Sequence, residues 1–99
     1  MTSNKPYYQQ QDETDILTEE DFNHQLIVWN DEVNTFEWVI DTLIEICGHS
    51  QTQAEQCAII IDSKGKYAVK NGEYETLKPM RDNITDRGIN ATIEELSAR

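Results

Sequence analysis

One short run, QLIVW at residues 25–29, constrains the possible fold of this chain more than any other feature of the sequence. Its β-branched and aromatic side chains are typical of a buried strand, and the polar residues Asn30, Asp31 and Glu32 end it. A helical pattern begins a few residues later. The run therefore predicts the first strand of a small domain that mixes strands and helices.

Residues 1–24, which precede this run, have a different composition. They are polar and acidic, with six acids against Lys5, and have too few apolar side chains to offset the entropy of ordering the backbone. We expect a flexible N-terminal arm over residues 1–24 and one folded domain over residues 25–99. The arm does not resemble a signal peptide, and no stretch has the 18 or so apolar residues that span a bilayer. The sequence thus predicts a cytoplasmic protein.

Two antiparallel helices are expected after the first strand. Asn34 and Glu37 form a capping-box arrangement that predicts the start of the first helix, and Gly48 predicts its end. Ser50 and Gln53 repeat the capping arrangement for the second helix. Apolar residues at three- and four-residue steps define the inner faces. They are Phe36, Val39, Ile40, Leu43, Ile46 and Cys47 in the first helix, and Ala54, Cys57, Ala58 and Ile61 in the second.

A turn and a second strand follow the helical pair. The segment SKGK after Asp62 has the composition of a turn. The segment KYAVK at residues 66–70 alternates well enough for a strand, which we expect Asn71 and Gly72 to end.

A third helix and a third strand complete the domain. The helix is expected to begin near residues 75–76, because Pro79 lacks an amide hydrogen and is tolerated only near a first turn. It should run to about Asp86 and end at Gly88. Residues 89–95 alternate between apolar and polar side chains, as in a half-buried strand. The order βααβαβ predicts an α+β domain, with three helices on one face of a small, mainly antiparallel three-stranded sheet.

The charge and the scarce motifs exclude several functions. A formal charge of −11 opposes binding to nucleic acid or to an anionic membrane. Cys47 and Cys57 lie within apolar helical patterns and are expected to be buried, reduced thiols. His24 and His49 lack the spacing of metal ligands and are expected to be solvated.

Four acids, Asp31, Glu32, Glu37 and Asp41, cluster around the start of the first helix. Such a cluster can serve acid and base chemistry or bind a hard cation, but acids in a first turn also simply face the positive end of the helix dipole. The sequence contains no glycine-rich phosphate loop, nucleophile elbow or CxxC pair. We therefore predict no catalytic residue, no metal, no cofactor and no enzymatic activity.

The run LIVWNDEVNTFEWVIDTLIEICGHSQTQAEQCAIIIDSKGKYAV closely resembles the ClpS adaptor family, and the likeness extends over residues 25 to about 95. ClpS proteins bind substrates with bulky hydrophobic N-terminal residues, called N-degrons, and hand them to a Clp AAA+ unfoldase for degradation. The resemblance implies the same role here. It also implies docking on the N-terminal domain of a ClpA- or ClpC-type unfoldase, and a use for residues 1–24 as the unstructured extension that delivery needs. We expect a monomer.

The resemblance implies a site for the substrate's α-amino group. Asn30 and Asp31 match positions that hold this group, and Asp62 stands where the family commonly has a histidine with the same role. The amino group is largely cationic at neutral pH, so a carboxylate can accept its hydrogen bond. Two carboxylates at one small site should repel each other, which raises one of their pKa values. We therefore expect peptide binding to weaken as the pH falls from 8 to 5, far enough to protonate Asp31 or Asp62.

A hydrophobic pocket beside this site is implied as well. Phe36 stands where the family usually has a gating methionine, and Ala58 where it has a methionine in the wall, so preference among Leu, Phe, Tyr and Trp should shift. The implied pocket residues are Asn34 at the mouth, Phe36 at the gate, and Val39, Ala58, Ile61 and Ile89 in the wall.

Two alternatives use the same residues differently. The order of elements is similar to that of the C-terminal domain of the ribosomal stalk protein, so the chain could be a ClpS-like interaction module that binds no degron. An enzyme would have to use Asp31 and Asp62 as a carboxylate pair.

Overall fold

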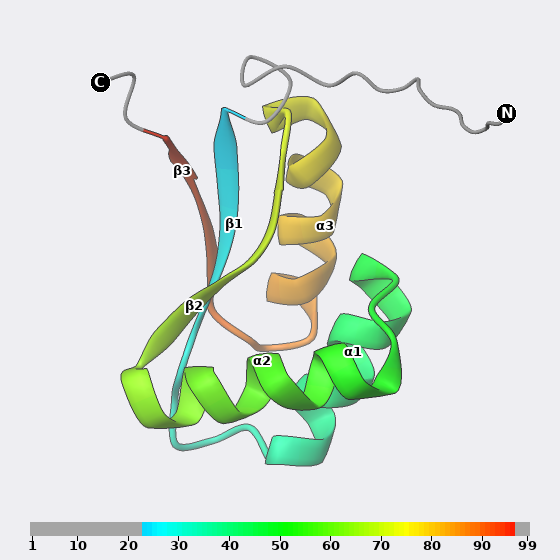
Figure 1. Cartoon of the computed structure of the whole chain (residues 1–99), viewed down its shortest axis with the longest axis vertical. Helices are drawn as coiled ribbons and strands as arrows, with labels where there is room; N and C mark the ends of the chain where they lie inside the picture. The colour runs from blue at the N-terminus through cyan, green and yellow to red at the C-terminus, as the bar shows by residue number, and fades with distance from the viewer. Residues whose placement is uncertain (1–22, 97–99) are drawn as a thin grey trace, which may run out of the picture.

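A three-stranded antiparallel sheet forms one layer of the protein, with its first strand in the centre (Figure 1). The computed structural model describes residues 23–96, so the predicted arm lies almost entirely outside the described residues. Both neighbouring strands pair antiparallel with the central one, and the sheet order is β2-β1-β3. The strands are β1 (His24–Trp29), β2 (Lys66–Gly72) and β3 (Ala91–Glu95).

Three helices form the second layer, on one side of the sheet (Figure 1). The element order βααβαβ and the antiparallel sheet confirm the predicted fold class. β1 begins at His24, the last residue assigned to the arm from the sequence. The helices are α1 (Phe36–Cys47), α2 (Gln51–Lys64) and α3 (Tyr74–Asp86).

The hydrophobic core lies between the two layers. Leu26 and Val28 of β1 pack into one cluster with Leu43 of α1 and with Leu77 and Ile84 of α3, and these side chains are at most 1% exposed. Each fully buried aliphatic side chain of this kind stabilises the fold by about 1.5 to 3 kcal/mol relative to an exposed one. The core therefore holds β1, α1 and α3 in fixed positions relative to one another.

The start of α1 differs from the prediction. The N-cap is Thr35, whose hydroxyl oxygen accepts a hydrogen bond from the Trp38 backbone N–H at 3.0 Å. Asn34 does not cap the helix, because its side chain is engaged with Asp31 and Gly88. The predicted end is confirmed, since Gly48 adopts the left-handed conformation with φ 75°.

The predicted inner face of α1 is only partly buried. Ile40, Leu43 and Cys47 are buried, as expected. Val39 and Ile46 are half-buried at the edge of the core. Phe36, the first residue of the helix, is 41% exposed, because it precedes the turn of α1 that first reaches the core.

The prediction for α2 holds at its start and on its inner face. Ser50 and Gln53 form both hydrogen bonds of a capping box. The helix continues to Lys64, so the expected SKGK turn is reduced to Gly65, which has φ 94° and ends the helix. All four predicted inner residues are buried: Ala54, Cys57, Ala58 and Ile61.

The second strand is longer than predicted. Asn71 and Gly72 do not end β2 but belong to it, and Gly72 pairs with His24 at the edge of the sheet. A Cβ at Gly72 would lie 3.5 Å from the Leu77 side chain, which is an ordinary van der Waals distance, so packing does not require glycine at this position.

Pro79 lies inside α3 rather than near its start. The helix begins at Tyr74, slightly earlier than predicted, so Pro79 falls in the second turn. A proline there leaves one helical hydrogen bond unmade. The buried side chains of Leu77 and Ile84, one on each side of Pro79, hold the helix on the core nevertheless.

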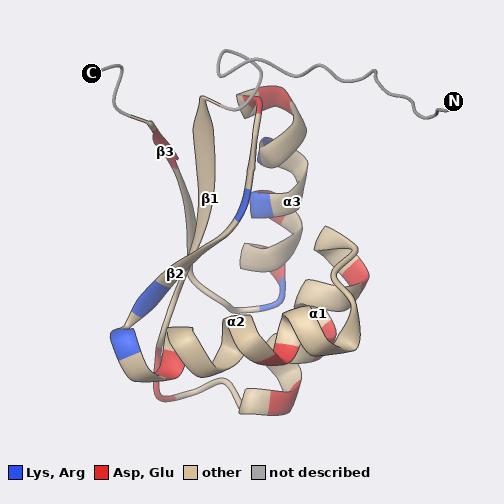
Figure 2. Cartoon of the chain, viewed as in Figure 1, with Lys and Arg blue, Asp and Glu red and all other residues tan. Residues whose placement is uncertain are grey.

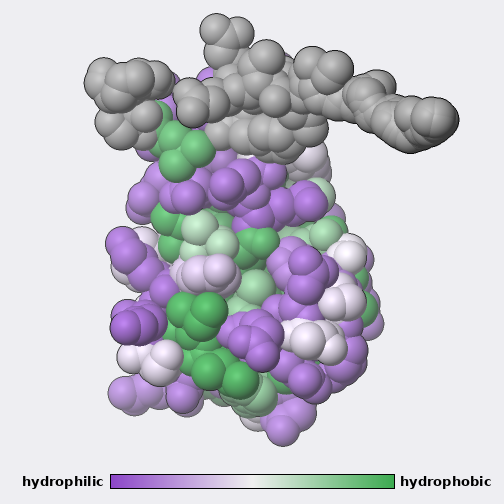
Figure 3. Space-filling view, in the orientation of Figure 1, coloured by the Kyte–Doolittle hydropathy of each residue, from purple (hydrophilic) through white to green (hydrophobic). Residues whose placement is uncertain are grey.

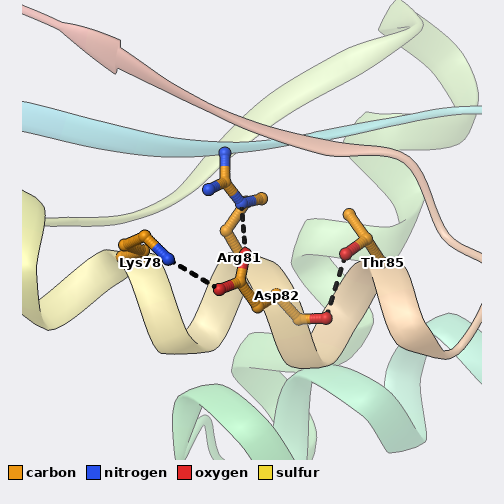
Figure 4. Close-up of polar contacts among 4 residues, drawn as sticks. All are labelled: Lys78, Arg81, Asp82 and Thr85. Atoms are coloured by element: carbon orange, nitrogen blue, oxygen red, sulfur yellow. Dashed lines mark hydrogen bonds and ion pairs between the residues drawn. The ribbon is translucent and has the colours of Figure 1, made fainter.

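A chain of polar contacts runs along α3, and the Arg81 side chain points from the helix toward the strands (Figure 4). Asp82 accepts hydrogen bonds from Arg81 at 2.8 Å and from Lys78 at 3.1 Å, and its backbone oxygen accepts one from the Thr85 hydroxyl at 2.9 Å. The Arg81 and Lys78 contacts lower the pKa of Asp82. The Lys78 and Asp82 side chains are 52% and 46% exposed and that of Arg81 is 28% exposed, so we assign these ion pairs a small effect on stability.

Candidate functional site

The polar turn after β1 is attached to two other parts of the fold. The backbone N–H of Asn30 donates to the Gly65 oxygen at the end of α2 at 2.9 Å. The Asn34 side-chain amide donates to the Gly88 oxygen, beyond the end of α3, also at 2.9 Å. The turn therefore bridges the ends of α2 and α3, and it brings together segments that are far apart in the sequence.

Asp31 holds the turn in shape. One carboxylate oxygen accepts the backbone N–H groups of Val33 and Asn34, both at 2.8 Å, and the other accepts the Asn34 side-chain amide at 2.8 Å. The pKa of Asp31 is lowered, chiefly by the backbone hydrogen bond from Asn34 and then by that of the Asn34 side chain. Donated hydrogen bonds stabilise the charged form, so Asp31 is not the carboxylate whose pKa repulsion was expected to raise.

Asp62 comes to the same region from another element. It lies in the last turn of α2, and its side chain is exposed, as is Asn30 at the end of β1. The bond from Asn30 to Gly65 fastens this last turn to the end of the strand. The three residues assigned to the α-amino group thus lie on two segments that are hydrogen-bonded to each other.

The predicted wall residues lie in the core rather than on an open surface. Ala58, Ile61 and Ile89 are 2%, 3% and 2% exposed, and Val39 is half-buried against them. Ile89 precedes β3 instead of forming part of it. A guest side chain can reach these residues only if a neighbouring side chain moves. Phe36 is the exposed apolar member of the predicted set.

A network of contacts around Arg87 fixes the segment that carries Gly88. The sequence did not predict this network. The Arg87 guanidinium contacts the Glu45 carboxylate at 2.7 Å and lies 5.3 Å from the centre of the Trp38 ring. It also donates to the Thr42 hydroxyl at 3.4 Å, while the Trp38 indole N–H donates to the Arg87 oxygen at 3.1 Å. No spacing rule pairs residues more than 40 positions apart, so only the fold reveals this network.

A groove of about 340 Å³ lies beside the predicted site, between α1 and α2. Phe36 lines it, but the other predicted pocket residues do not. Its lining residues are Phe36, Glu37, Ile40 and Asp41 of α1 and Gln51, Glu55 and Ile59 of α2. The groove therefore shares Phe36 with the predicted pocket and continues away from it along the two helices.

His49, Cys47 and Cys57 are each held by contacts within the fold. His49 is not solvated as expected, since a ring nitrogen lies 2.9 Å from the Val69 oxygen. Cys47 and Cys57 are buried and free, as predicted, and burial raises both pKa values, to about 11 for Cys47.

Within residues 23–96, no three His, Cys, Asp or Glu side chains are grouped so that they could hold a metal ion. None of the helices in this range is long and apolar enough to cross a membrane.

A comparison with solved structures defines the class of protein first. The structure of Agrobacterium tumefaciens ClpS2 bound to L-phenylalaninamide superposes with a TM-score of 0.70 at 18% sequence identity, over 73% of this chain and 94% of that one. The chain therefore has the same fold as ClpS2, a small α+β domain with a three-stranded sheet.

The sequence comparisons then give the family. The family model for the ATP-dependent Clp protease adaptor protein ClpS matches residues 19–94. The ClpS adapter protein of Corynebacterium aurimucosum is 26% identical over 83 residues, which is 84% of this chain and 75% of that protein. That of Nocardia farcinica is 26% identical over 81 residues, or 82% of this chain and 76% of that protein. The chain belongs to the ClpS family of Clp protease adaptors, which are not themselves the protease.

Proposed function

We propose that this protein binds substrates with a bulky hydrophobic N-terminal residue and delivers them to a Clp AAA+ unfoldase. The observation that carries the proposal is the turn at residues 30–34, which is tied to the ends of both α2 and α3. Such a turn presents carboxylate and amide oxygens from a fixed backbone. A fixed set of acceptors suits a small cationic group such as a chain terminus.

Asn30, Asp31 and Asp62 are proposed to hold the α-amino group. A carboxylate has about four acceptor positions, and Asp31 uses three of them within the turn, which leaves one for the ligand. Asp62 has an exposed carboxylate in the last turn of α2. A hydrogen bond to a charged group contributes about 1.5 to 3 kcal/mol.

The first side chain of the substrate is proposed to enter beside Phe36. Asn34 would border the mouth, and Phe36, which is 41% exposed, would move to admit the guest to the wall formed by Val39, Ala58, Ile61 and Ile89. The related ClpS2 structure holds L-phenylalaninamide, a ligand with a free amino group and an aromatic side chain. Burying a side chain of this size adds about 1.5 to 3 kcal/mol, so affinity should be micromolar at best once the cost of association is subtracted.

Binding of the degron is tested by titrating two peptides of the same sequence, one starting with a free leucine and the other with an acetylated leucine. Acetylation removes the charge of the amino group and leaves acceptors unpaired, so only the free peptide should bind. Asp31→Ala should abolish binding, whereas Asp62→His should retain it, because an imidazole can also accept a hydrogen bond. Equal affinity for both peptides would instead favour an interaction module without a degron site.

Delivery is tested separately with a chain that lacks residues 1–20. These residues carry the acidic, polar sequence proposed as the extension needed by the unfoldase, whose N-terminal domain would dock on the folded part. The truncated chain should bind the free peptide as the full chain does but should no longer stimulate degradation by a ClpA- or ClpC-type unfoldase with its protease. Undiminished degradation would refute a role for the arm.

A further inference from the structure

The groove between α1 and α2 has an apolar floor that it shares with the proposed degron pocket only at Phe36. Phe36 is 41% exposed and Ile59 is 51% exposed, although both are large apolar side chains. Ile40 lines the floor between the helices. The surface view shows apolar side chains gathered over α2 in the lower half of the molecule, bordered by hydrophilic ones (Figure 3). The groove therefore offers an apolar contact to a ligand.

The rim of the groove is acidic. Its charged lining residues are Glu37, Asp41 and Glu55, all exposed. In the described part of the chain, lysines and arginines occur only from Lys64 onward, at the end of α2, on β2 and along or just after α3 (Figure 2). No described cation on α1 or on the groove side of α2 neutralises the rim, so the groove favours an occupant that is both apolar and basic.

The protein's own segments do not have this character. Residues 1–22 contain six acids and one lysine, and a second copy of the chain carries the same net charge of −11. Both would be repelled by the rim. The occupant with complementary charge is a separate polypeptide that contains an apolar residue next to lysine or arginine.

The groove is aligned with the amino-group site. Asp62, Ile59, Glu55 and Gln51 follow one another on α2 at steps of three, four and four residues, so they lie along one side of the helix. With a rise of about 1.5 Å per residue, the stretch from Asp62 to Ile59 spans roughly 4.5 Å, and that from Ile59 to Gln51 roughly 12 Å. An extended peptide advances about 3.3 Å per residue. The stretch from Asp62 to Ile59 therefore corresponds to roughly one or two peptide residues, and the stretch from Ile59 to Gln51 to about four.

We infer that this groove is a second subsite for the substrate, which takes the segment after its N-terminal residue. An apolar residue near the third position would lie between Phe36 and Ile59, and a lysine or arginine one to three positions later would meet Glu55, Glu37 or Asp41. The inference rests on the proposed function. It adds a preference for the substrate's downstream sequence to the preference for its first residue.

The experiment compares three ligands with a free N-terminal leucine. They are leucinamide, the peptide Leu-Ala-Ile-Lys-Lys-Gly and the peptide Leu-Ala-Ser-Glu-Glu-Gly. The Ile-Lys-Lys peptide should bind about tenfold tighter than the Ser-Glu-Glu peptide, with a difference that shrinks in high salt because part of it is electrostatic. Ile59→Ser and Glu55→Gln should each remove a large part of this difference, while leucinamide binding stays unchanged.

Glu94→Gln, an exposed acid on β3, is the matched control for Glu55→Gln, since it makes the same charge change away from the groove. If leucinamide binds but the two peptides bind equally, the second subsite is refuted and the degron site stands. If no ligand binds better than its acetylated form, the proposed function itself fails. If Glu94→Gln and Glu55→Gln lower the preference for the Ile-Lys-Lys peptide equally, the preference comes from the net charge of the protein alone. That result would also overturn the subsite.

Discussion

Asn34 donates its side-chain amide to the Asp31 carboxylate at 2.8 Å and to the Gly88 oxygen at 2.9 Å, and so joins the turn after β1 to the segment after α3. Asn34→Ala removes both bonds but leaves the backbone N–H bond from residue 34 to Asp31 in place. We expect a loss of about 1 kcal/mol in the free energy of unfolding, because the site is partly exposed. Urea denaturation measures this loss.

The same substitution should affect peptide binding more than it affects stability. Without the link to Gly88, the turn is less well fixed, and binding the amino group must then order it. We expect the affinity for a Leu-initiated peptide to fall about tenfold or more. Asn83→Ala, at an exposed position of α3, is the control for the loss of an asparagine side chain. An affinity that stays at the wild-type value would mean that Asn34 has no part in shaping the site.

The lowered pKa of Asp31 determines how stability should depend on pH. A carboxyl group whose pKa is lower in the folded state stabilises the fold above its ordinary pKa, here 3.8, and this contribution is lost as the pH falls through the folded value. The stability difference between the wild type and Asp31→Asn should therefore be constant from pH 8 to about pH 5 and shrink below about pH 4. Urea unfolding of both proteins at several pH values tests this. A difference that already shrinks between pH 7 and pH 5 would contradict the assigned direction.

Peptide binding above pH 5 consequently cannot weaken through protonation of Asp31. A substrate α-amino group, with an ordinary pKa of about 7.7 to 8.0, gains charge as the pH falls from 8, which should strengthen binding. The affinity for a Leu-initiated peptide, measured by titration at several pH values from 8 to 5, tests this prediction. An affinity that falls with the pH over this range would contradict it.

Arg87 should contribute to stability through several contacts at once. Arg87→Ala removes the ion pair with Glu45, the hydrogen bond to Thr42 and the cation–π contact with Trp38. We expect a loss of about 1 to 2 kcal/mol in unfolding free energy, with partial recovery in Arg87→Lys, because lysine keeps the charge but not the planar fork. Arg81→Ala is the control, since Arg81 pairs with the exposed Asp82 on its own helix. Equal losses at Arg81 and Arg87 would contradict the role of the network.

The helices and strands were predictable where one local signal acts without competition. The capping box of Ser50 and Gln53 gave the start of α2, because no distant group competes for either side chain. The same signal at Asn34 misplaced the N-cap of α1, because Asn34 bonds to Gly88, 54 positions away, and Thr35 caps the helix instead. Pro79 misplaced the start of α3, because burial of Leu77 and Ile84 outweighs one missing hydrogen bond.

The candidate site was also only partly predictable from the sequence. The resemblance of residues 26–69 to a family supplied the positions of Asn30, Asp31 and Asp62. It did not supply the state of those groups, because the pKa of Asp31 depends on hydrogen bonds within the folded turn. The groove was also missed, since the exposure of Ile59 depends on how closely α1 approaches α2, which periodicity does not give.

The two cysteines should be inert in the folded protein. Burial raises the pKa of Cys47 to about 11 and also raises that of Cys57, so little thiolate is present at pH 8. We expect a thiol reagent such as DTNB to label neither in native buffer within minutes and to label both in concentrated urea. Cys57→Ala, assayed in the same way, assigns any slow native reaction to one residue. Rapid native labelling would contradict the buried positions.

Phe36 connects the proposed pocket with the groove, so its replacement should alter selectivity rather than folding. It is 41% exposed at the first position of α1, and Phe36→Ala should therefore change the free energy of unfolding by less than about 1 kcal/mol. Phe36 is the proposed gate of the pocket, so removal of its ring should leave more room for the guest side chain and favour larger ones. We expect the affinity for a Trp-initiated peptide, relative to that for a Leu-initiated one, to rise at least about threefold in Phe36→Ala. Phe36→Met should give a ratio between those of the wild type and Phe36→Ala, because the flexible methionine side chain fills part of the space. Val33→Ala, at a residue that is 88% exposed in the same turn, is the control and should leave the ratio unchanged. A ratio that stays constant in Phe36→Ala, with peptide binding retained, would show that Phe36 does not gate the pocket.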